Sequence, residues 1–234
     1  MSIMNISMPL RFALLGLLVI PAAIGCTLSA AAKLPAGTVA TGDGSGAGRK
    51  TANGFFVVKT APKTLPGKTE IARFAGGCFW GIEDYFRKEP GVIATAVGFS
   101  GGHVANPSYE RVCEGDTGHA ESVEVEFDPT KTTYEKMVRL FFEIHNPTEL
   151  NRQGPDVGYQ YRSVAFYRSP EQQKTLIDTI AALQKTAEFK DDKIVTEIIP
   201  AGPFYFAEDY HQQYVEKGGH AYCHVRTPHD FGGK

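Results

Sequence analysis

From residue 70 onward, short strand-like segments alternate with helix-like segments, and no segment repeats another. The strand-like segments are β-branched or alternate apolar with polar residues, whereas the helix-like segments place apolar residues three or four positions apart. This alternation is typical of one α/β domain with a mixed sheet. We expect strands over residues 71–75, 92–97, 121–127, 162–167 and 194–199. We expect helices over residues 78–88, 133–145, 170–187 and 208–216.

Local signals fix some of the boundaries between these segments. Thr132 with Glu135 predicts a capping box at the start of the second helix, and Ser169-Pro170 predicts the start of the third. The glycine-rich residues 98–107 predict a loop after the second strand.

Composition and charge restrict the class of protein. The 234 residues are 42% hydrophobic and 21% charged, and 24 basic residues against 26 acidic ones give a net charge of −2. This is ordinary globular composition, which excludes a disordered or collagen-like chain. The near-neutral balance gives no electrostatic footprint for nucleic acid, so we expect no nucleic-acid partner.

The N-terminus is typical of a bacterial export signal. Arg11 precedes the apolar run 12–20, which is too short for a comfortable membrane span. Ala30-Ala31-Ala32 predicts a signal-peptide cleavage site that would make residues 1–32 the leader. Cys26 offers a competing lipoprotein site that would make residues 1–25 the leader and anchor the protein through a lipid.

Two regions follow the leader. Residues 33–69 are rich in Gly, Ala, Thr, Pro and Lys, a composition that predicts a flexible linker. Residues 70–234 form the expected folded domain. We therefore expect an exported protein, either periplasmic or anchored to the membrane, that acts as a monomer.

Cys78 follows two glycines and opens a helix. Unpaired amides and the positive end of a helix stabilise a thiolate at such a position. Phe79 and Trp80, which come next, offer an apolar pocket beside the sulfur. The alternative is a buried structural cysteine, which is the more common fate of a lone cysteine.

Glu121 breaks the alternation of its strand. Val123, Val125 and Phe127 share one face, and the same parity places the Glu121 carboxyl on that apolar face. Burial raises the pKa of a carboxyl group, so Glu121 is a candidate general acid that keeps its proton beside a Cys78 thiolate. The alternative is a strand that begins later in the chain, so that Glu121 precedes it and is exposed to solvent.

Cys223 lies in a glycine-containing tail. Such a tail can bring a second sulfur to a first one, so that a sulfenic acid on one cysteine is attacked by the other to close a disulfide. A zinc site competes with this interpretation, because ligand-type residues are dense around it: His220, Cys223, His224 and His229.

Several motifs, in order along the chain, resemble those of type A peptide-methionine sulfoxide reductases. The resemblance runs from about residue 70 to Cys223. The motifs are Gly77-Cys78-Phe79-Trp80-Gly81, Gly98-Phe99-Ser100-Gly101-Gly102, Asn106-Pro107-Ser108-Tyr109, Gly115-Asp116-Thr117-Gly118-His119-Ala120-Glu121, Gln160-Tyr161-Arg162-Ser163 and Ala207-Glu208-Asp209-Tyr210-His211-Gln212-Gln213-Tyr214.

The resemblance implies a role for each matching residue. Cys78 would attack the sulfoxide sulfur, and Cys223 would be the resolving cysteine. The groups that hydrogen-bond the sulfoxide oxygen would be Glu121, Tyr109 and Tyr161. The substrate methyl group would lie against Phe79 and Trp80, and Asp156 would help to hold the site together.

The resemblance also implies the reaction and the fold. The S epimer of methionine sulfoxide, free or in oxidised proteins, would be reduced with a thioredoxin-like reductant and with no metal or organic cofactor. The fold would be a two-layer α/β (α+β) sandwich with a mixed sheet, a ferredoxin-like core and a long coil-rich C-terminal tail. The sequence departs from the family at Pro155 and Tyr159, which affects the rim of the site. Cys113 has no catalytic counterpart, and we expect it to be a small buried helix residue.

Two other functions compete with this assignment. A papain-like protease would pair Cys78 with a histidine such as His211. A zinc-binding or substrate-binding lipoprotein would use the tail histidines without catalysis.

Overall fold

The computed structural model describes residues 49–50, 56–57, 69–222 and 224–231. The predicted leader, with its two processing sites, therefore lies outside the described residues, as do most of the predicted linker and Cys223. Within the linker, β1 (Arg49–Lys50) pairs with β2 (Phe56–Val57) in an antiparallel two-stranded sheet. In the described part of the chain, no helix is both long and apolar enough to cross a membrane.

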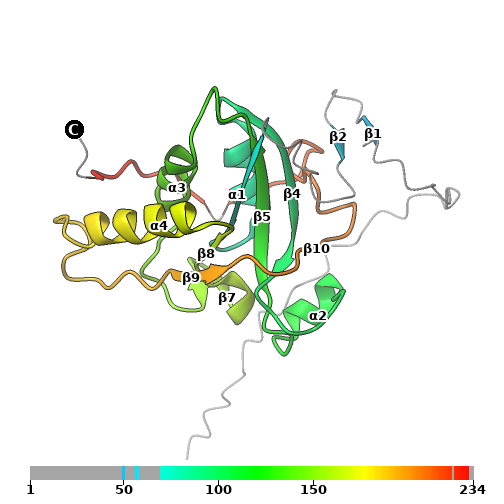
Figure 1. Ribbon diagram of the computed structural model, residues 1–234. Coiled ribbons are helices and arrows are strands. Elements are labelled where there is room, and N and C mark those ends of the chain that lie inside the picture. Colours follow the sequence, from blue (N-terminus) through cyan, green and yellow to red (C-terminus); the bar gives the residue numbers. More distant parts are fainter. Residues whose placement is uncertain (1–48, 51–55, 58–68, 223, 232–234) are drawn as a thin grey trace, which may run out of the picture. The chain divides into compact units, whose positions relative to one another are not determined.

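A six-stranded mixed sheet in the order β10-β4-β5-β3-β8-β9 forms the centre of the domain (Figure 1). Its strands are β3 (Glu70–Ala75), β4 (Val92–Ser100), β5 (Ala120–Phe127), β8 (Val164–Tyr167), β9 (Glu197–Pro200) and β10 (Tyr205–Phe206). Neighbouring strands are antiparallel except for β8 and β9, which are parallel. The sheet is mixed and contains the five predicted strands, whereas β10 was not predicted.

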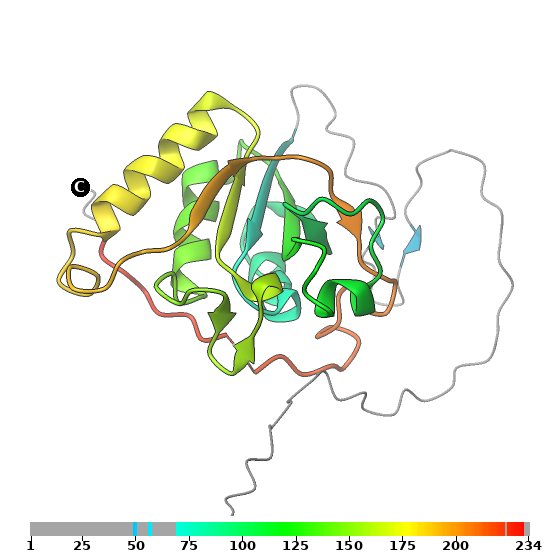
Figure 2. The same cartoon turned by 90° about the horizontal axis from the view of Figure 1, so that it is seen from below.

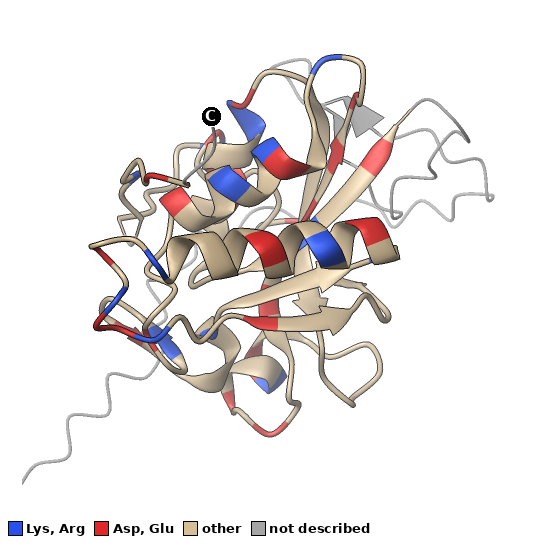
Figure 3. Cartoon of the chain, turned by 60° about the vertical axis from the view of Figure 1, so that its left-hand side comes forward, with Lys and Arg blue, Asp and Glu red and all other residues tan. Residues whose placement is uncertain are grey.

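The three longest helices share one apolar core with the sheet. They are α1 (Phe79–Arg87), α3 (Tyr134–Glu143) and α4 (Pro170–Leu183). The order β3-α1-β4-β5-α3-β8, with β4-β5-β3-β8 adjacent in the sheet, is the ferredoxin-like arrangement. The fold implied by the family resemblance is therefore confirmed. Figure 3 shows acidic and basic residues interspersed over the helices.

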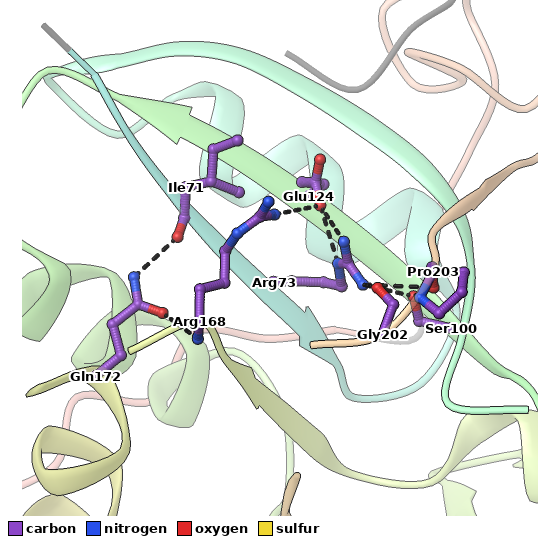
Figure 4. A network of polar contacts seen from close by, with 8 residues as sticks. All are labelled: Ile71, Arg73, Ser100, Glu124, Arg168, Gln172, Gly202 and Pro203. Carbon is purple, nitrogen blue, oxygen red and sulfur yellow. Dashed lines mark hydrogen bonds and ion pairs between the residues drawn. The ribbon is translucent and has the colours of Figure 1, made fainter. Parts of the chain in front are cut away.

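Strand β5 has the parity that the sequence predicted. Val123, Val125 and Phe127 are fully buried, and Glu121 on the same face is only 2% exposed. Glu124, on the opposite face, is also fully buried, because Arg73 from β3 lies beside it and donates hydrogen bonds to its carboxylate (Figure 4). Both faces of β5 are thus covered.

The predicted start of α3 was wrong by one residue. The N-cap is Thr133, whose hydroxyl accepts a hydrogen bond from the Lys136 amide at 3.2 Å. Thr132 is buried, its amide bonded to the Asp128 carbonyl, and an added Cβ on Gly91 would lie 2.8 Å from its methyl group. Its side chain is therefore used in packing rather than in a cap.

Two other predicted boundaries also differ from the structure. Residues 98–100, predicted as loop, continue β4, because Gly98 lets the backbone of β10 approach: a Cβ there would lie 2.2 Å from the Tyr205 carbonyl oxygen. Helix α4 ends at Leu183 rather than at residue 187.

Residues 208–216 were predicted as a helix, but residues 209–218 form consecutive turns. Gln213 has a positive φ of 49°, which a right-handed helix excludes. The Gln212 side chain accepts from the Val97 amide and donates to the Val97 and Ala207 carbonyls. The two bonds to Val97 hold the segment against β4 in place of helical bonds. Beyond it, the chain passes the start of α1 and follows α3 (Figure 2), as expected for a coil-rich tail.

Candidate active site

Cys78 is the N-cap of α1, as the sequence predicted. Strand β3 ends at Ala75, and Gly77 makes the turn into the helix with a φ of +103°, a conformation that favours glycine. The Cys78 thiol is half-buried. Its sulfur therefore lies at the positive end of a helix, where a thiolate is stabilised.

Glu121 is buried next to this helix start. Its Oε2 accepts a hydrogen bond of 3.1 Å from the amide of Phe79, the residue after Cys78. Burial raises the pKa of Glu121 to about 8, an effect that the Phe79 hydrogen bond opposes and the nearby Asp156 charge reinforces. The carboxyl group is thus mostly protonated at neutral pH and can donate a proton. The predicted burial of Glu121 is confirmed, and the alternative of a solvated Glu121 is wrong.

Three of the predicted aromatic residues lie together at the site. Phe79 is buried, and Trp80 and Tyr109 are half-buried. The Phe79 ring centroid lies 6.4 Å from that of Trp80 and 6.5 Å from that of Tyr109. Tyr109 opens the short helix α2 (Tyr109–Cys113). Cys113 ends the same helix and is half-buried, so it is more exposed than the sequence predicted.

Asp156 and Tyr161, the remaining predicted site residues that the structure describes, belong to one further segment. It contains β6 (Arg152–Gln153), β7 (Asp156–Val157) and the 3₁₀ helix η1 (Tyr159–Tyr161). The Asp156 charge raises the pKa of Glu121, and its buried Oδ2 atom has no hydrogen-bond partner. Tyr161 is half-buried on η1, which packs against β5.

Pro155 and Tyr159, where the motifs differ from those of the family, flank Asp156 and Tyr161 in the chain. Pro155 is exposed, and the Tyr159 ring is 41% exposed with the Arg162 guanidinium 4.0 Å from its centroid. Arg162 is itself buried and donates to the Gly118 carbonyl. Tyr159 is therefore an exposed aromatic residue on the same 3₁₀ helix as Tyr161.

Two tail residues complete the site, and sequence reasoning missed their roles. Trp80 Nε1 donates to His211 Nδ1 at 3.0 Å, and the Tyr214 ring stacks on the indole at a centroid distance of 3.8 Å. The 207–214 motif contained both residues but gave no sign of their contact with Trp80. His211 is thus bonded to an indole, unlike the base of a cysteine protease, which pairs with the thiol.

His224 packs against the start of α1, next to Cys78. Its Nε2 is 2.9 Å from the Cys78 carbonyl oxygen, and its Nδ1 is 2.9 Å from that of Ile144. A Cβ on Gly81 would lie 2.2 Å from the ring, so the second glycine of the Cys78 motif makes room for it. His229, further along the tail, contacts Glu188 and the Phe142 carbonyl. Within residues 69–222 and 224–231, no cluster of three metal-ligand side chains is present.

Comparisons with known proteins identify the family. Residues 70–231 match the family model for peptide methionine sulfoxide reductase. The chain belongs to that family. A peptide methionine sulfoxide reductase MsrA of Methanothermobacter thermautotrophicus is 56% identical over 156 residues, which cover 67% of this chain and 92% of the relative. Peptide methionine sulfoxide reductase A2 of Arabidopsis thaliana is 53% identical over 154 residues, covering 66% and 69%.

Solved structures of sulfoxide reductases resemble the domain. Reduced Mxr1 of Saccharomyces cerevisiae has a TM-score of 0.63 and 38% identity, covering 68% of this chain and 91% of that one. Methionine sulfoxide reductase A of Corynebacterium diphtheriae has a TM-score of 0.61 and 41% identity, covering 68% and 79%. The chain is therefore an oxidoreductase that acts on peptide methionine sulfoxide, as the motifs implied.

Proposed function

We propose that this reductase converts the S epimer of methionine sulfoxide, free or within oxidised proteins, to methionine by means of a sulfenic acid on Cys78. The observation that carries the proposal is the hydrogen bond between Glu121 and the Phe79 amide. It holds a buried, protonated carboxyl group next to the residue whose sulfur begins the helix. A nucleophile and an acid at one helix start are the two groups that sulfoxide reduction requires.

The first step transfers the oxygen atom from substrate to enzyme. The Cys78 thiolate attacks the sulfoxide sulfur while Glu121 protonates the oxygen, which gives an intermediate with a bond between the two sulfur atoms. The hydroxyl group then passes to the Cys78 sulfur as the S–O bond of the substrate and the S–S bond break, and methionine leaves. The oxygen ends on Cys78 as a sulfenic acid, so the cysteine is oxidised as the sulfoxide is reduced to methionine. Glu121 is protonated again by solvent or by the proton that the Cys78 thiol released.

The surrounding side chains orient the substrate. Phe79 and Trp80 would contact the S-methyl group, and the hydroxyl groups of Tyr109 and Tyr161 would donate to the sulfoxide oxygen with Glu121. Asp156 would support the acid by keeping its pKa high, in line with its electrostatic effect on Glu121. Because methyl group, oxygen and attacking sulfur each have a fixed place, only one epimer would fit.

The second step uses Cys223, which lies outside the described residues. Its thiol would attack the Cys78 sulfenic acid, giving a Cys78–Cys223 disulfide and one water. A thioredoxin-like dithiol would then reduce the disulfide, and the cycle would use neither a metal nor an organic cofactor. Residues 224–234 contain no cysteine that could pass the disulfide outward, so the reductant would act on it directly.

A single-turnover experiment tests this sequence of steps. The reduced protein is mixed with each purified sulfoxide epimer without reductant, and methionine and free thiols are counted. We expect one methionine per chain with the S epimer, none with the R epimer, and the loss of two thiols. Cys223→Ser should still form methionine but close no disulfide, and Cys113→Ser should match the wild type. No methionine from the wild type would refute the proposal.

We also propose that the protein is exported, as the leader pattern predicts, and works outside the cytoplasm as a monomer. Its reductant would then be an exported thioredoxin-like protein or one fed across the membrane. Fractionation of cells that express the full chain would locate it. Lipid labelling that is lost in Cys26→Ala would favour the anchored form, and an N-terminus at Lys33 would favour the released one.

A further inference from the structure

His211 occupies the centre of the aromatic cluster and is itself only 1% exposed. Its ring centroid lies 5.2 Å from that of Phe79, 5.4 Å from that of Trp80 and 4.4 Å from that of Tyr109. The ring therefore fills the space among three groups that come from two separate helices, α1 and α2. Any change in the position of His211 would be transmitted to the rings of the site.

The Trp80 indole has a single donor, Nε1–H, and gives it to His211 Nδ1 at 3.0 Å. An indole can only donate, so Nδ1 must be the acceptor and the proton of the neutral imidazole must lie on Nε2. Nε2 faces the Glu208 Oε2 atom at 3.8 Å, and neither atom has a hydrogen-bond partner. An acidic oxygen on that side favours the tautomer that leaves Nδ1 free to accept.

Glu208 connects the same histidine to Tyr109. Its other oxygen, Oε1, accepts a hydrogen bond of 3.0 Å from the Tyr109 amide. Glu208 thus lies between the start of α2 and the Nε2 side of His211. Glu208 thus connects the backbone of α2, through His211, to the Trp80 indole.

We propose that His211 is a positioning residue for the methyl-binding wall of the site, holding the Trp80 indole through Nδ1 and separating it from Tyr109 by its ring. The proposal rests on the proposed function in placing Trp80 at the S-methyl group. The Tyr214 stack fixes the plane of the indole, whereas the His211 hydrogen bond fixes its rotation within that plane. Together they would determine how closely a methyl group is held.

Protonation would break this hydrogen bond. The imidazolium carries N–H on both nitrogens, so Nδ1 would then face the indole donor with a donor of its own. Burial lowers the pKa of His211 to about 4, the Glu110 charge opposes that effect and the Lys217 charge adds to it. Glu208 and the side chains of Tyr109 and Tyr210 are the other titratable groups against the ring. The acceptor is therefore retained at neutral pH.

The test uses the fact that Trp80 is the only tryptophan in the chain. His211→Leu removes the acceptor, and His211→Asn keeps one near the place of Nδ1. We expect His211→Leu to shift the fluorescence emission of Trp80 and to raise KM for methionine sulfoxide by about tenfold, with a smaller effect on kcat. His211→Asn should restore most of the KM and of the emission. On acidification, the wild-type emission should change near pH 4 while circular dichroism still shows folded protein, and His211→Asn should show no such change.

A matched control is His229→Leu, which removes another tail histidine whose side chain is only 5% exposed. It should leave emission and KM unchanged even if it lowers the melting temperature. A second comparison is Trp80→Phe, which has no indole N–H, so adding His211→Leu to it should raise KM far less than in the wild-type background.

Two outcomes would overturn the proposal. One is a His211→Leu variant that folds with wild-type emission and KM. The other is an Asn variant as impaired as the Leu variant, which would show that the ring only fills space. If the wild type reduced no sulfoxide, the proposed function would fail, yet the emission data would still decide whether His211 holds the indole.

Discussion

The amide of Phe79 and the carboxyl group of Glu121 are joined by a hydrogen bond of 3.1 Å between residues 42 positions apart in the chain. The bond ties the first turn of α1, where Cys78 is the N-cap, to the buried face of β5. Two opposing effects act on the pKa of this acid. The amide stabilises the carboxylate, but burial outweighs it and raises the pKa to about 8.

Glu121→Gln should therefore change both the rate and its dependence on pH. The amide keeps the shape and accepts from Phe79 but has no acidic proton, so we expect kcat to fall about 10²- to 10³-fold. In the wild type, the rate should decline as pH rises through about 8, where the acid loses its proton. Steady-state rates from pH 6 to 10 measure both effects.

Glu126→Gln is the control for this substitution, since Glu126 lies on the other face of the same strand and is half-buried. It should keep the wild-type rate and the decline at high pH. A Glu121→Gln variant that still shows that decline would assign it to another group.

A second buried acid should make stability depend on pH. Glu83 on α1 accepts hydrogen bonds from Thr95 Oγ1 and from the Gln213 amide, and burial raises its pKa to about 7. Because the pKa is raised in the folded state, this contribution to stability is complete below about pH 4.5 and is lost as pH rises through about 7. The loss amounts to about 3 kcal/mol.

Glu83→Gln should remove that part of the pH dependence. We expect the difference in unfolding free energy between pH 5 and pH 8, measured in urea, to shrink by about 3 kcal/mol, with the Glu121 contribution remaining. Glu70→Gln, at an exposed position, should leave the difference unchanged. An equal pH dependence in Glu83→Gln and the wild type would contradict this account.

The sequence predicted the parts of the site that depend on local pattern. The parity of β5 predicted that Glu121 is buried, because side chains alternate strictly along a strand. The glycines before Cys78 predicted the helix start, because a left-handed turn favours glycine. Both signals lie within a few residues of the group that they place.

The parts that the sequence did not predict depend on contacts between distant segments. Gln212 bonds to Val97, 115 positions away, and this contact replaces the predicted helix by turns. His211 and His224 reach Trp80 and Cys78 over 131 and 146 positions. No periodicity within the tail could indicate which carbonyl or indole each ring would meet.

Gly81→Ala should reverse the usual effect of this substitution in a helix. Alanine in place of a helical glycine normally stabilises by about 1 kcal/mol. At Gly81 the added Cβ would lie 2.2 Å from the His224 ring, which is bonded to the Cys78 and Ile144 carbonyls and must shift. We expect a loss of about 1–3 kcal/mol in unfolding free energy.

Gly202→Ala provides the comparison, because nothing lies within 4 Å of its added Cβ. Its stability in urea should equal that of the wild type within error. If Gly81→Ala were as stable as Gly202→Ala, the contact between His224 and α1 would not be tight in solution.

The ion pair between Arg73 and Glu124 should matter far more than the one between Arg168 and Glu124. Arg73 Nη2 lies 2.6 Å from the fully buried Glu124 carboxylate, and Arg73 Nη1 donates to Ser100 Oγ and the Gly202 carbonyl (Figure 4). Arg168 contacts the same oxygen at 3.2 Å, but its side chain is 41% exposed. A buried carboxylate without its main partner keeps its full cost of desolvation, whereas an exposed partner is readily replaced by water.

Arg73→Met should accordingly destabilise the domain by about 3–5 kcal/mol, and Arg168→Met by less than about 1 kcal/mol. Urea unfolding at pH 7 measures both variants. Adding Glu124→Gln to Arg73→Met should recover part of the loss, because the neutral amide is less costly to bury than a lone carboxylate. Equal losses in Arg73→Met and Arg168→Met would mean that Glu124 is reached by water in solution, and the double variant would then recover nothing.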